Sequence, residues 1–324
     1  MIGKSTSVPL GVGMVWAPGI EPLLEPGMDL IDVVEIEPQL YRGYVPGEAR
    51  PCRMQDGILP HLAGLGKPVL VHGMGGAAGI TESIKPAWVS GHLGFLTEAG
   101  RDERYFTGMM LPPLQTPEGV QSAVRHLRAA TQGFDFPFAL ETQVNHMQSR
   151  CSTLGDGDFL ARVVRGADCG ILLDLGNILA NEKNGRQPVE EYLASLPLDR
   201  VWEAHLGGTG PLSDELLALT ESVLPRLRNL KALILEVTPN RVPGGSIEWL
   251  ARQLELMRKL WDGRGKRGPG LRASPLPAST LKALPGGLPI TPALWERALG
   301  EWTALGHGKG ALFEHLRGDR GMET

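Results

Sequence analysis

Short hydrophobic runs alternate with longer amphipathic segments along the first 260 residues of the chain. The runs are continuous and rich in Val, Leu and Ile, which is typical of parallel strands buried on both faces. There are eight of them, namely VPLGVGMVW from Val8, LIDVVEIEP from Leu30, PVLVHG, AWVSGHLGF, FPFALET, GILLDLGN, RVWEAHLGG and KALILEV. A closed barrel of parallel strands requires this number.

Segments of helical length and period separate most of these runs. They begin at Thr116, Asp156, Pro188 and Ser213. Alternating strands and helices are typical of βα units around a parallel sheet. The pattern therefore predicts the α/β class and, within it, a (β/α)8 TIM barrel over residues 1–260, close to the roughly 250 residues that such barrels contain.

The composition changes after residue 260. Residues 261–282 are rich in Gly, Pro and basic side chains, which predicts an exposed linker. In residues 283–324, Leu, Trp, Ala and Phe recur at helical spacing, which predicts a short helical C-terminal extension. This extension would either pack against the barrel or offer a surface to a peptide or a partner.

Six of the hydrophobic runs end with a residue that can bind a metal. In a TIM barrel the C-terminal ends of the strands surround the active site, so these side chains would converge. Three imidazoles and three carboxylates in one bowl would repel or desolvate one another without a cation. Any one of them alone could instead be a structural polar group at a strand end. The candidate metal ligands are His72, His92, Glu141, Asp174, His205 and Glu236.

Other polar residues lie near these strand ends. Glu37 follows the second run and would orient a ligand, contact a substrate or cap a loop. His146, in the segment after FPFALET, would reach a substrate or metal, or lie in a solvated loop. Asn177 and Asn181 follow Asp174, and turn formation explains Asn181 as well as a role in the site does.

Charge and cysteine content exclude several classes of protein. The net charge of −4 and the pI of about 6.1 give no basic surface for nucleic acid. The three cysteines are odd in number and form no CxxC pair, which argues against a disulfide framework and a zinc knuckle. No apolar stretch resembles a signal peptide or reaches membrane-spanning length, so we expect a cytoplasmic protein that does not bind membranes.

The succession VHG, SGHL, ALET, LLDLGN, EAHLGG and LILEV, together with its spacing, resembles the DUF 692 family, the multinuclear non-haem iron-dependent oxidative enzymes (MNIO). The resemblance implies a barrel of the xylose-isomerase-like type. It also implies an oxidoreductase that uses iron and dioxygen to modify a peptide, usually at cysteine, in the biosynthesis of ribosomal peptide natural products. The partners implied are a cysteine-containing precursor peptide and, in many members, a leader-binding protein.

The resemblance also implies roles for the six candidate ligands. His72, His92 and Glu141 would hold the first iron and form the catalytic centre. Glu141 would bridge to a second iron, held also by Asp174, His205 and Glu236. Imidazole and carboxylate ligands suit non-haem iron, although the same set would accept zinc or manganese.

The chain departs from the family pattern near the third iron site. The loop that carries an Asp-Thr-His-Gly segment in the family is missing, because AHLGGTG runs directly into PLSDELLALT. We therefore expect two iron ions and a lost third site, with Asn177 left as a residual ligand or as a group that orients one.

Two further positions beside the ligands differ from the family pattern. We expect Gly91 and Thr142 to remove hydrogen bonds that orient the ligands.

Two alternative functions stay open. One is a metal-dependent hydrolase or isomerase of the xylose-isomerase-like superfamily, and the other is a degenerate member that binds a peptide without turnover.

Overall fold

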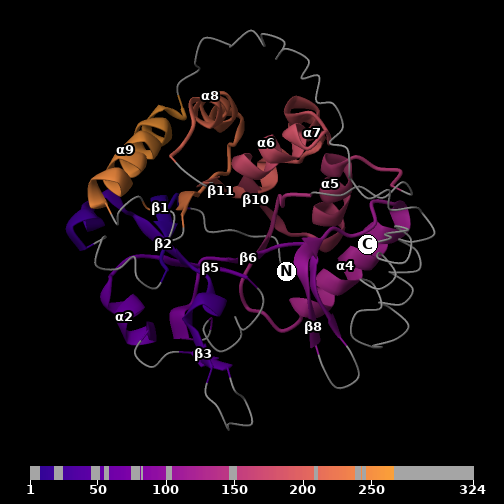
Figure 1. The fold of residues 1–324 in the computed structure, drawn as a ribbon, viewed down its shortest axis with the longest axis horizontal. Helices are drawn as coiled ribbons and strands as arrows, with labels where there is room; N and C mark the ends of the chain where they lie inside the picture. Colours follow the sequence, from indigo (N-terminus) through magenta and orange to yellow (C-terminus); the bar gives the residue numbers. More distant parts are fainter. Residues whose placement is uncertain are drawn as a thin grey trace, which may run out of the picture.

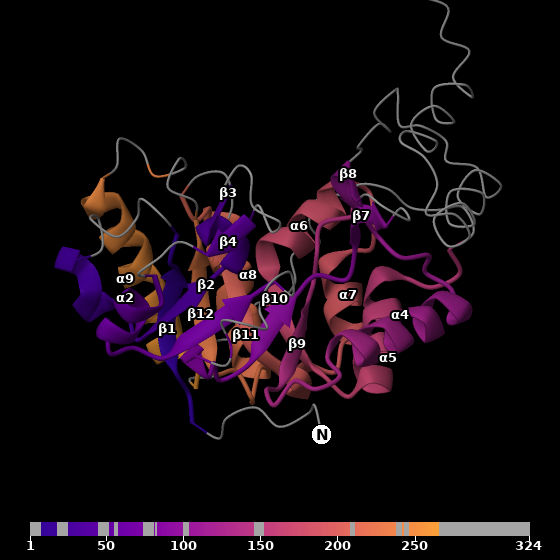
Figure 2. The ribbon, with the colours of Figure 1, turned by 90° about the horizontal axis from the view of Figure 1, so that it is seen from below.

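Eight parallel strands close into a barrel in this computed structural model, which confirms the expected fold class (Figures 1 and 2). The structure describes residues 8–17, 25–44, 52–54, 58–73, 81, 83–99, 104–145, 152–207, 211–237, 242 and 246–265. The strands follow one another around the barrel in the order β1-β12-β11-β10-β9-β6-β5-β2. Their bounds are β1 (Gly11–Val15), β2 (Val33–Ile36), β5 (Val69–His72), β6 (Val89–Gly91), β9 (Phe138–Glu141), β10 (Gly170–Asp174), β11 (Val201–Gly207) and β12 (Ala232–Glu236).

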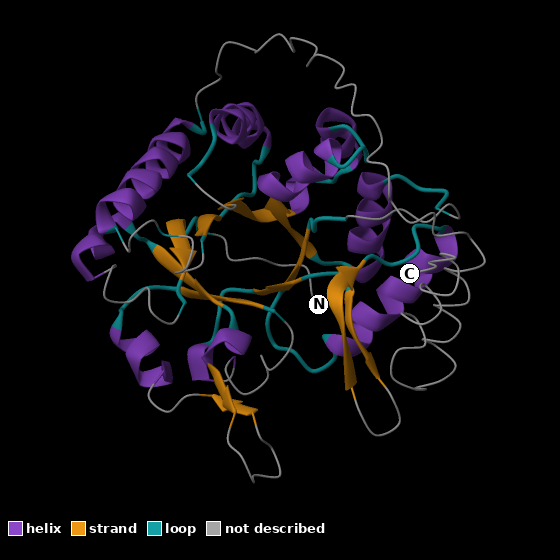
Figure 3. Cartoon of the chain, in the orientation of Figure 1, coloured by secondary structure: helices purple, strands orange, loops and turns teal. Residues whose placement is uncertain are grey.

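Helices surround the barrel on its outer face (Figure 3). They are α2 (Ile58–Gly64), α4 (Pro117–Ala130), α5 (Asp156–Ala167), α6 (Leu175–Lys183), α7 (Val189–Ser195), α8 (Asp214–Val223) and α9 (Ile247–Gly263), with short 3-10 helices at η1 (Glu25–Leu30), η2 (Pro38–Tyr41), η3 (Leu198–Arg200) and η4 (Leu224–Arg226). Two of the expected helix starts are capping residues, because Thr116 and Ser213 accept hydrogen bonds from backbone N–H groups in the first turns of α4 and α8. None of the described helices combines the length and apolar composition needed to cross a membrane.

Apolar side chains fill two layers of core. The larger layer lies between strands and helices, and a smaller cluster lies inside the barrel, where Val33, Leu70, Trp88, Leu172 and Ile234 are almost fully buried. Because successive side chains of a strand point to opposite faces, each strand contributes to both layers. This packing fixes the strand ends that carry the candidate ligands.

Two antiparallel hairpins follow barrel strands and were not expected from the sequence. One pairs β3 (Arg42–Tyr44) with β4 (Cys52–Met54), and the other pairs β7 (Phe95–Ala99) with β8 (Arg104–Leu111). The run AWVSGHLGF, expected to be one strand, therefore contributes to two, because β6 ends at Gly91 and β7 begins at Phe95. Both hairpins lie at the upper edge of the barrel in Figure 2, on the side where its strands end.

The last described helix runs past residue 260, where the sequence pattern placed the end of the barrel domain. Helix α9 packs against β1 and β12 and continues to Gly263. The rest of the expected linker, from residue 266, and the expected helical extension of residues 283–324 lie outside the described residues.

Candidate metal centre

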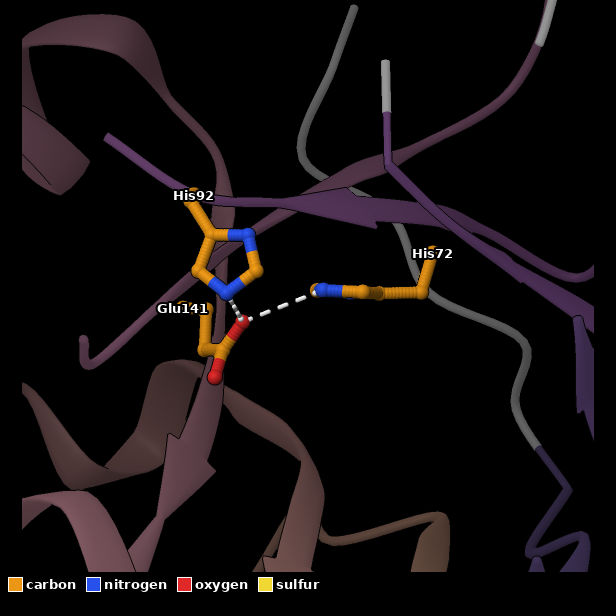
Figure 4. A group of neighbouring side chains, drawn as sticks. All are labelled: His72, His92 and Glu141. Atoms are coloured by element: carbon orange, nitrogen blue, oxygen red, sulfur yellow. Dashed lines mark ion pairs between the residues drawn. The ribbon is translucent and has the colours of Figure 1, made fainter. Parts of the chain in front are cut away.

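Three strand ends bring His72, His92 and Glu141 together (Figure 4). His72 is the last residue of β5, His92 follows β6, and Glu141 is the last residue of β9. Oε2 of Glu141 lies 3.2 Å from Nε2 of His72 and 2.6 Å from Nε2 of His92. The two imidazole rings meet edge to face, with centroids 4.7 Å apart. One carboxylate oxygen therefore faces two ring nitrogens, which is the geometry of a three-ligand group.

Charges within this group shift the pKa values of its members. Burial alone would raise the pKa of Glu141, but the charges and hydrogen bonds of His92 and His72 hold it well below its ordinary value. Burial alone would lower the pKa of His72, but the hydrogen bond and charge of Glu141, with the charge of Glu35, raise it to about 9. Glu141 is therefore a carboxylate at neutral pH, as a metal ligand needs to be.

A second group shares Glu141 with the first. It consists of Glu141, Asp174 and His205, whose ligand atoms all lie within 4.8 Å of one another. Asp174 ends β10, and burial, followed by the charges of Glu236 and Glu141, raises its pKa well above the ordinary value. Glu236 ends β12, and its Oε2 lies 3.6 Å from Nδ1 of His205. All six expected ligands thus lie together at the C-terminal ends of the barrel strands, which we call the bowl, and Glu141 is common to both groups.

Hydrogen bonds hold several of these side chains in place. Nδ2 of Asn177, expected to be a residual ligand or a group that orients one, donates to Oε1 of Glu141 at 3.1 Å. The backbone N–H of Asp174 donates to Oγ1 of Thr142 at 2.8 Å, and this hydroxyl donates to the carbonyl of Asp174 at 3.2 Å. Thr142, expected to remove a hydrogen bond that orients the ligands, thus bonds the backbone of Asp174. Nδ1 of His72 lies 2.8 Å from the hydroxyl of Ser90, which directs Nε2 toward Glu141.

Two buried carboxylates inside the barrel were missed by the sequence analysis. Glu35 of β2 and Glu203 of β11 are both fully buried, and their oxygens lie 3.0 and 3.7 Å from Nε2 of His205. Burial, followed by the charge of Glu203, raises the pKa of Glu35 to about 8. The alternation of side chains along a strand was the signal, because a residue two positions before the inward-facing His205 also points into the barrel.

The other polar residues singled out from the sequence are Glu37, Asn181 and His146. Glu37 follows β2 and is half-buried; burial raises its pKa, while the charge of His72 opposes this. Asn181 of α6 accepts from the backbone N–H of Asn145 at 2.7 Å and donates to the carbonyl of Gln143 at 3.0 Å. It therefore fixes the backbone of the segment after Glu141. His146 lies outside the described residues.

The donor atoms of the bowl fit a divalent cation. Among the described residues, several buried atoms have no aligned hydrogen bond although oppositely charged groups lie close by: Oε2 of Glu141, both ring nitrogens of His205, both oxygens of Glu35 and Oε1 of Glu203. Buried polar atoms without hydrogen bonds are costly, and a bound cation would compensate those that face it. Imidazole nitrogens with carboxylate oxygens suit iron, manganese or zinc.

Cation binding is expected to depend on pH through His72. With a pKa of about 9, His72 is protonated at neutral pH in the metal-free protein, and a cation has to displace this proton. We expect the apparent affinity of the His72, His92 and Glu141 group for Mn(II) to rise about tenfold per pH unit below pH 9, because binding there releases one proton from His72. Calorimetric titrations between about pH 6.5 and 8.5 measure this rise. An affinity that does not change over this interval would contradict protonation of His72.

Comparison with known proteins places these residues within one family. The model of the family described as "RiPP precursor modification enzyme MbnB/TglH/ChrH" matches residues 64–236, a range that includes all six expected ligands. A UPF0276 protein from Caulobacter vibrioides is 24% identical over 278 residues, which cover 78% of this chain and 93% of that protein. Another UPF0276 protein, from Anaeromyxobacter sp. (strain Fw109-5), is 33% identical over 129 residues, 40% of this chain and 44% of that protein.

Solved structures with a similar fold include sugar epimerases. D-allulose 3-epimerase from Methylomonas sp. superposes with a TM-score of 0.50 and 13% identity, covering 79% of this chain and 100% of that one. L-ribulose 3-epimerase gives a TM-score of 0.50 and 14% identity, covering 80% of this chain and 99% of that one. At this level of identity the likeness shows the barrel fold alone.

Proposed function

Because the chain belongs to the family of RiPP precursor modification enzymes MbnB/TglH/ChrH, we propose that it oxidatively modifies a ribosomally made precursor peptide, at cysteine, using iron and dioxygen. The observation that carries this proposal is the pair of three-ligand groups that share Glu141 at the strand ends. A shared carboxylate suits two cations about 3.5 to 4 Å apart, the usual separation in two-metal sites.

In this proposal the six candidate ligands form two iron sites. His72, His92 and Glu141 would hold the first iron, and Glu141 would also serve the second. Asp174, His205 and Glu236 would complete the second site. Bound iron would supply the one-electron and dioxygen chemistry that side chains do not provide.

The protein contributes rigid positioning and a dry environment. Glu141 is held at Oε1 by Asn177, and His72 is held at Nδ1 by Ser90, so both enter the site already oriented. The side chains of His72, Glu141 and His205 are at most 3% exposed. Their burial keeps bulk water away from the cations and strengthens the electrostatic interactions there.

Substrate approaches the bowl from the side of His92 in this proposal. The side chain of His92 is 34% exposed, in contrast to its buried neighbour Glu141. A cavity of about 540 Å³ reaches His92 and is lined by Leu93, Leu114 and Leu127, among other residues between β6 and β7, just before α4 and along α4. We assign this cavity to the residues that flank the reacting cysteine of the peptide.

Metal analysis of protein purified without oxygen tests the iron assignment. Elemental analysis with Mössbauer spectroscopy is expected to find two irons per chain, magnetically coupled through the shared carboxylate. Stoichiometric zinc that persists after anaerobic reconstitution with iron would contradict the assignment and favour a hydrolase or isomerase.

The reaction is tested with a short cysteine-containing peptide encoded beside this gene. We expect a change in peptide mass that requires both iron and dioxygen and that a Cys→Ser peptide does not undergo. A mass change that proceeds equally without dioxygen would contradict the oxidative reaction. Epimerisation of a ketose by the iron-loaded protein, with the peptide unchanged, would replace the proposal by a sugar reaction.

A further inference from the structure

Glu35 lies inside the barrel, below the proposed iron ligands, and the proposed function gives it no role. It is fully buried, and neither of its carboxylate oxygens has an aligned hydrogen bond among the described residues. Its nearest oppositely charged neighbour is His205, with 3.0 Å between Oε1 of Glu35 and Nε2 of the ring. A fully buried carboxylate that makes no aligned hydrogen bond is costly, so the position of Glu35 in the barrel interior requires an explanation.

The two nitrogens of His205 face different carboxylates. Nδ1 lies 3.6 Å from Glu236 at the strand ends, whereas Nε2 lies 3.0 Å from Glu35 in the barrel interior. Neutral imidazole carries its proton on one nitrogen and offers a lone pair on the other. A proton held on Nε2 therefore leaves the lone pair of Nδ1 directed to the strand-end bowl.

We propose that Glu35 is a positioning residue that accepts the Nε2–H of His205 and so presents Nδ1 to the cation held with Glu141 and Asp174. This inference rests on the proposed cation site. The 3.0 Å between Oε1 of Glu35 and Nε2 of His205 is within the range of a hydrogen bond. Histidine ligands of metals commonly donate their second N–H to a carboxylate, which fixes the tautomer and strengthens the ligand.

Glu203 does not replace Glu35 in this role. Its Oε1 lies 3.7 Å from Nε2 of His205, and its Oε2 already accepts a hydrogen bond from Nε1 of Trp88 at 2.8 Å. Glu203 is as deeply buried as Glu35 and is the same type of side chain. A Glu203→Gln variant therefore serves as a matched control, because glutamine keeps an acceptor for Trp88 while the buried charge is lost.

The experiment compares Glu35→Leu, Glu35→Gln and Glu203→Gln with the wild type. Zn(II) binding is followed by calorimetry, and ¹⁵N-histidine NMR of the Zn(II)-loaded protein reports the tautomer of His205. For Glu35→Leu we expect the second Zn(II) to bind about 10 to 100 times more weakly and the Nε2–H signal to change. Glu35→Gln restores the tautomer, because its amide oxygen accepts the same N–H, and Glu203→Gln binds both ions like the wild type.

Binding of the first Zn(II) at His72, His92 and Glu141 shows that each variant is folded. The proposal is overturned if Glu35→Leu binds the second ion with unchanged affinity and tautomer. It is also overturned if the wild type binds three ions and Glu35→Leu binds two, since Glu35 would then be a ligand itself. Absence of any Zn(II) binding in the wild type would refute the proposed cation site instead.

Discussion

Replacing Glu141 with alanine is expected to remove both irons and to lower the rate of peptide modification at least about a thousandfold, the equivalent of about 4 kcal/mol in the barrier. Oε2 of Glu141 faces both His72 and His92, and the same side chain completes the group with Asp174 and His205. Without this carboxylate, each cation loses a ligand and its negative charge. Elemental analysis and mass spectrometry of the peptide measure the two effects.

The control for this substitution is Glu191→Ala. Glu191 lies exposed on α7, so its loss is expected to leave the iron content and the rate unchanged. Circular dichroism during heating shows whether the Glu141→Ala protein is still folded. A folded Glu141→Ala variant that keeps two irons, or that still modifies the peptide, would show that Glu141 does not bridge the two sites.

The barrel could be predicted from the sequence because its signal is local and repeated. Each buried parallel strand reads as a continuous apolar run, so the runs that form β5, β9 and β10 mark strands without any knowledge of their partners. The closed topology then places the ends of all eight strands at one edge. This geometry explains why His72, Glu141 and Asp174, which are distant in the sequence, were expected together and lie together in the structure.

The interior carboxylates could not be recognised in the same way. Glu35 and Glu203 each stand within an apolar run, and strand alternation places Glu203 inside the barrel only after His205 on the same strand has been recognised as facing inward. The contact of Glu35 with His205 depends on how β2 and β11 are placed across the barrel, which no local pattern specifies. The two hairpins also depend on pairing between segments, and their strands carry no long apolar run.

A buried polar network beside the candidate ligands could not be predicted either, because it joins residues that are distant in the sequence. Asp156 opens α5 and accepts hydrogen bonds from Gln115, Asn145 and Arg186, which come from three separate loops and turns. Asp156 had been assigned from the sequence only to the start of a helix. Its partners lie up to 41 residues away in the sequence, so the network becomes visible only when the barrel has folded.

Replacing Arg186 with alanine is expected to destabilise the folded protein by about 3 to 5 kcal/mol, because the substitution leaves Asp156 as a buried charge without its counter-ion. The side chains of both residues are 4% exposed, and Nε of Arg186 donates to Oδ2 of Asp156 at 2.8 Å. Arg186 also donates to Gln115 at 3.2 Å, so its loss leaves a further buried acceptor unsatisfied. Urea denaturation followed by circular dichroism measures the change.

The pair of Arg200 and Asp168 is a matched control on the surface of the same protein. Its N–O distance is 2.9 Å, but the side chains are 32% and 59% exposed, so water already solvates both charges. We therefore expect Arg200→Ala to cost less than about 1 kcal/mol. Burial rather than contact distance would then account for the difference between the two variants. Equal losses of stability in Arg186→Ala and Arg200→Ala would show that desolvation of Asp156 does not determine the cost.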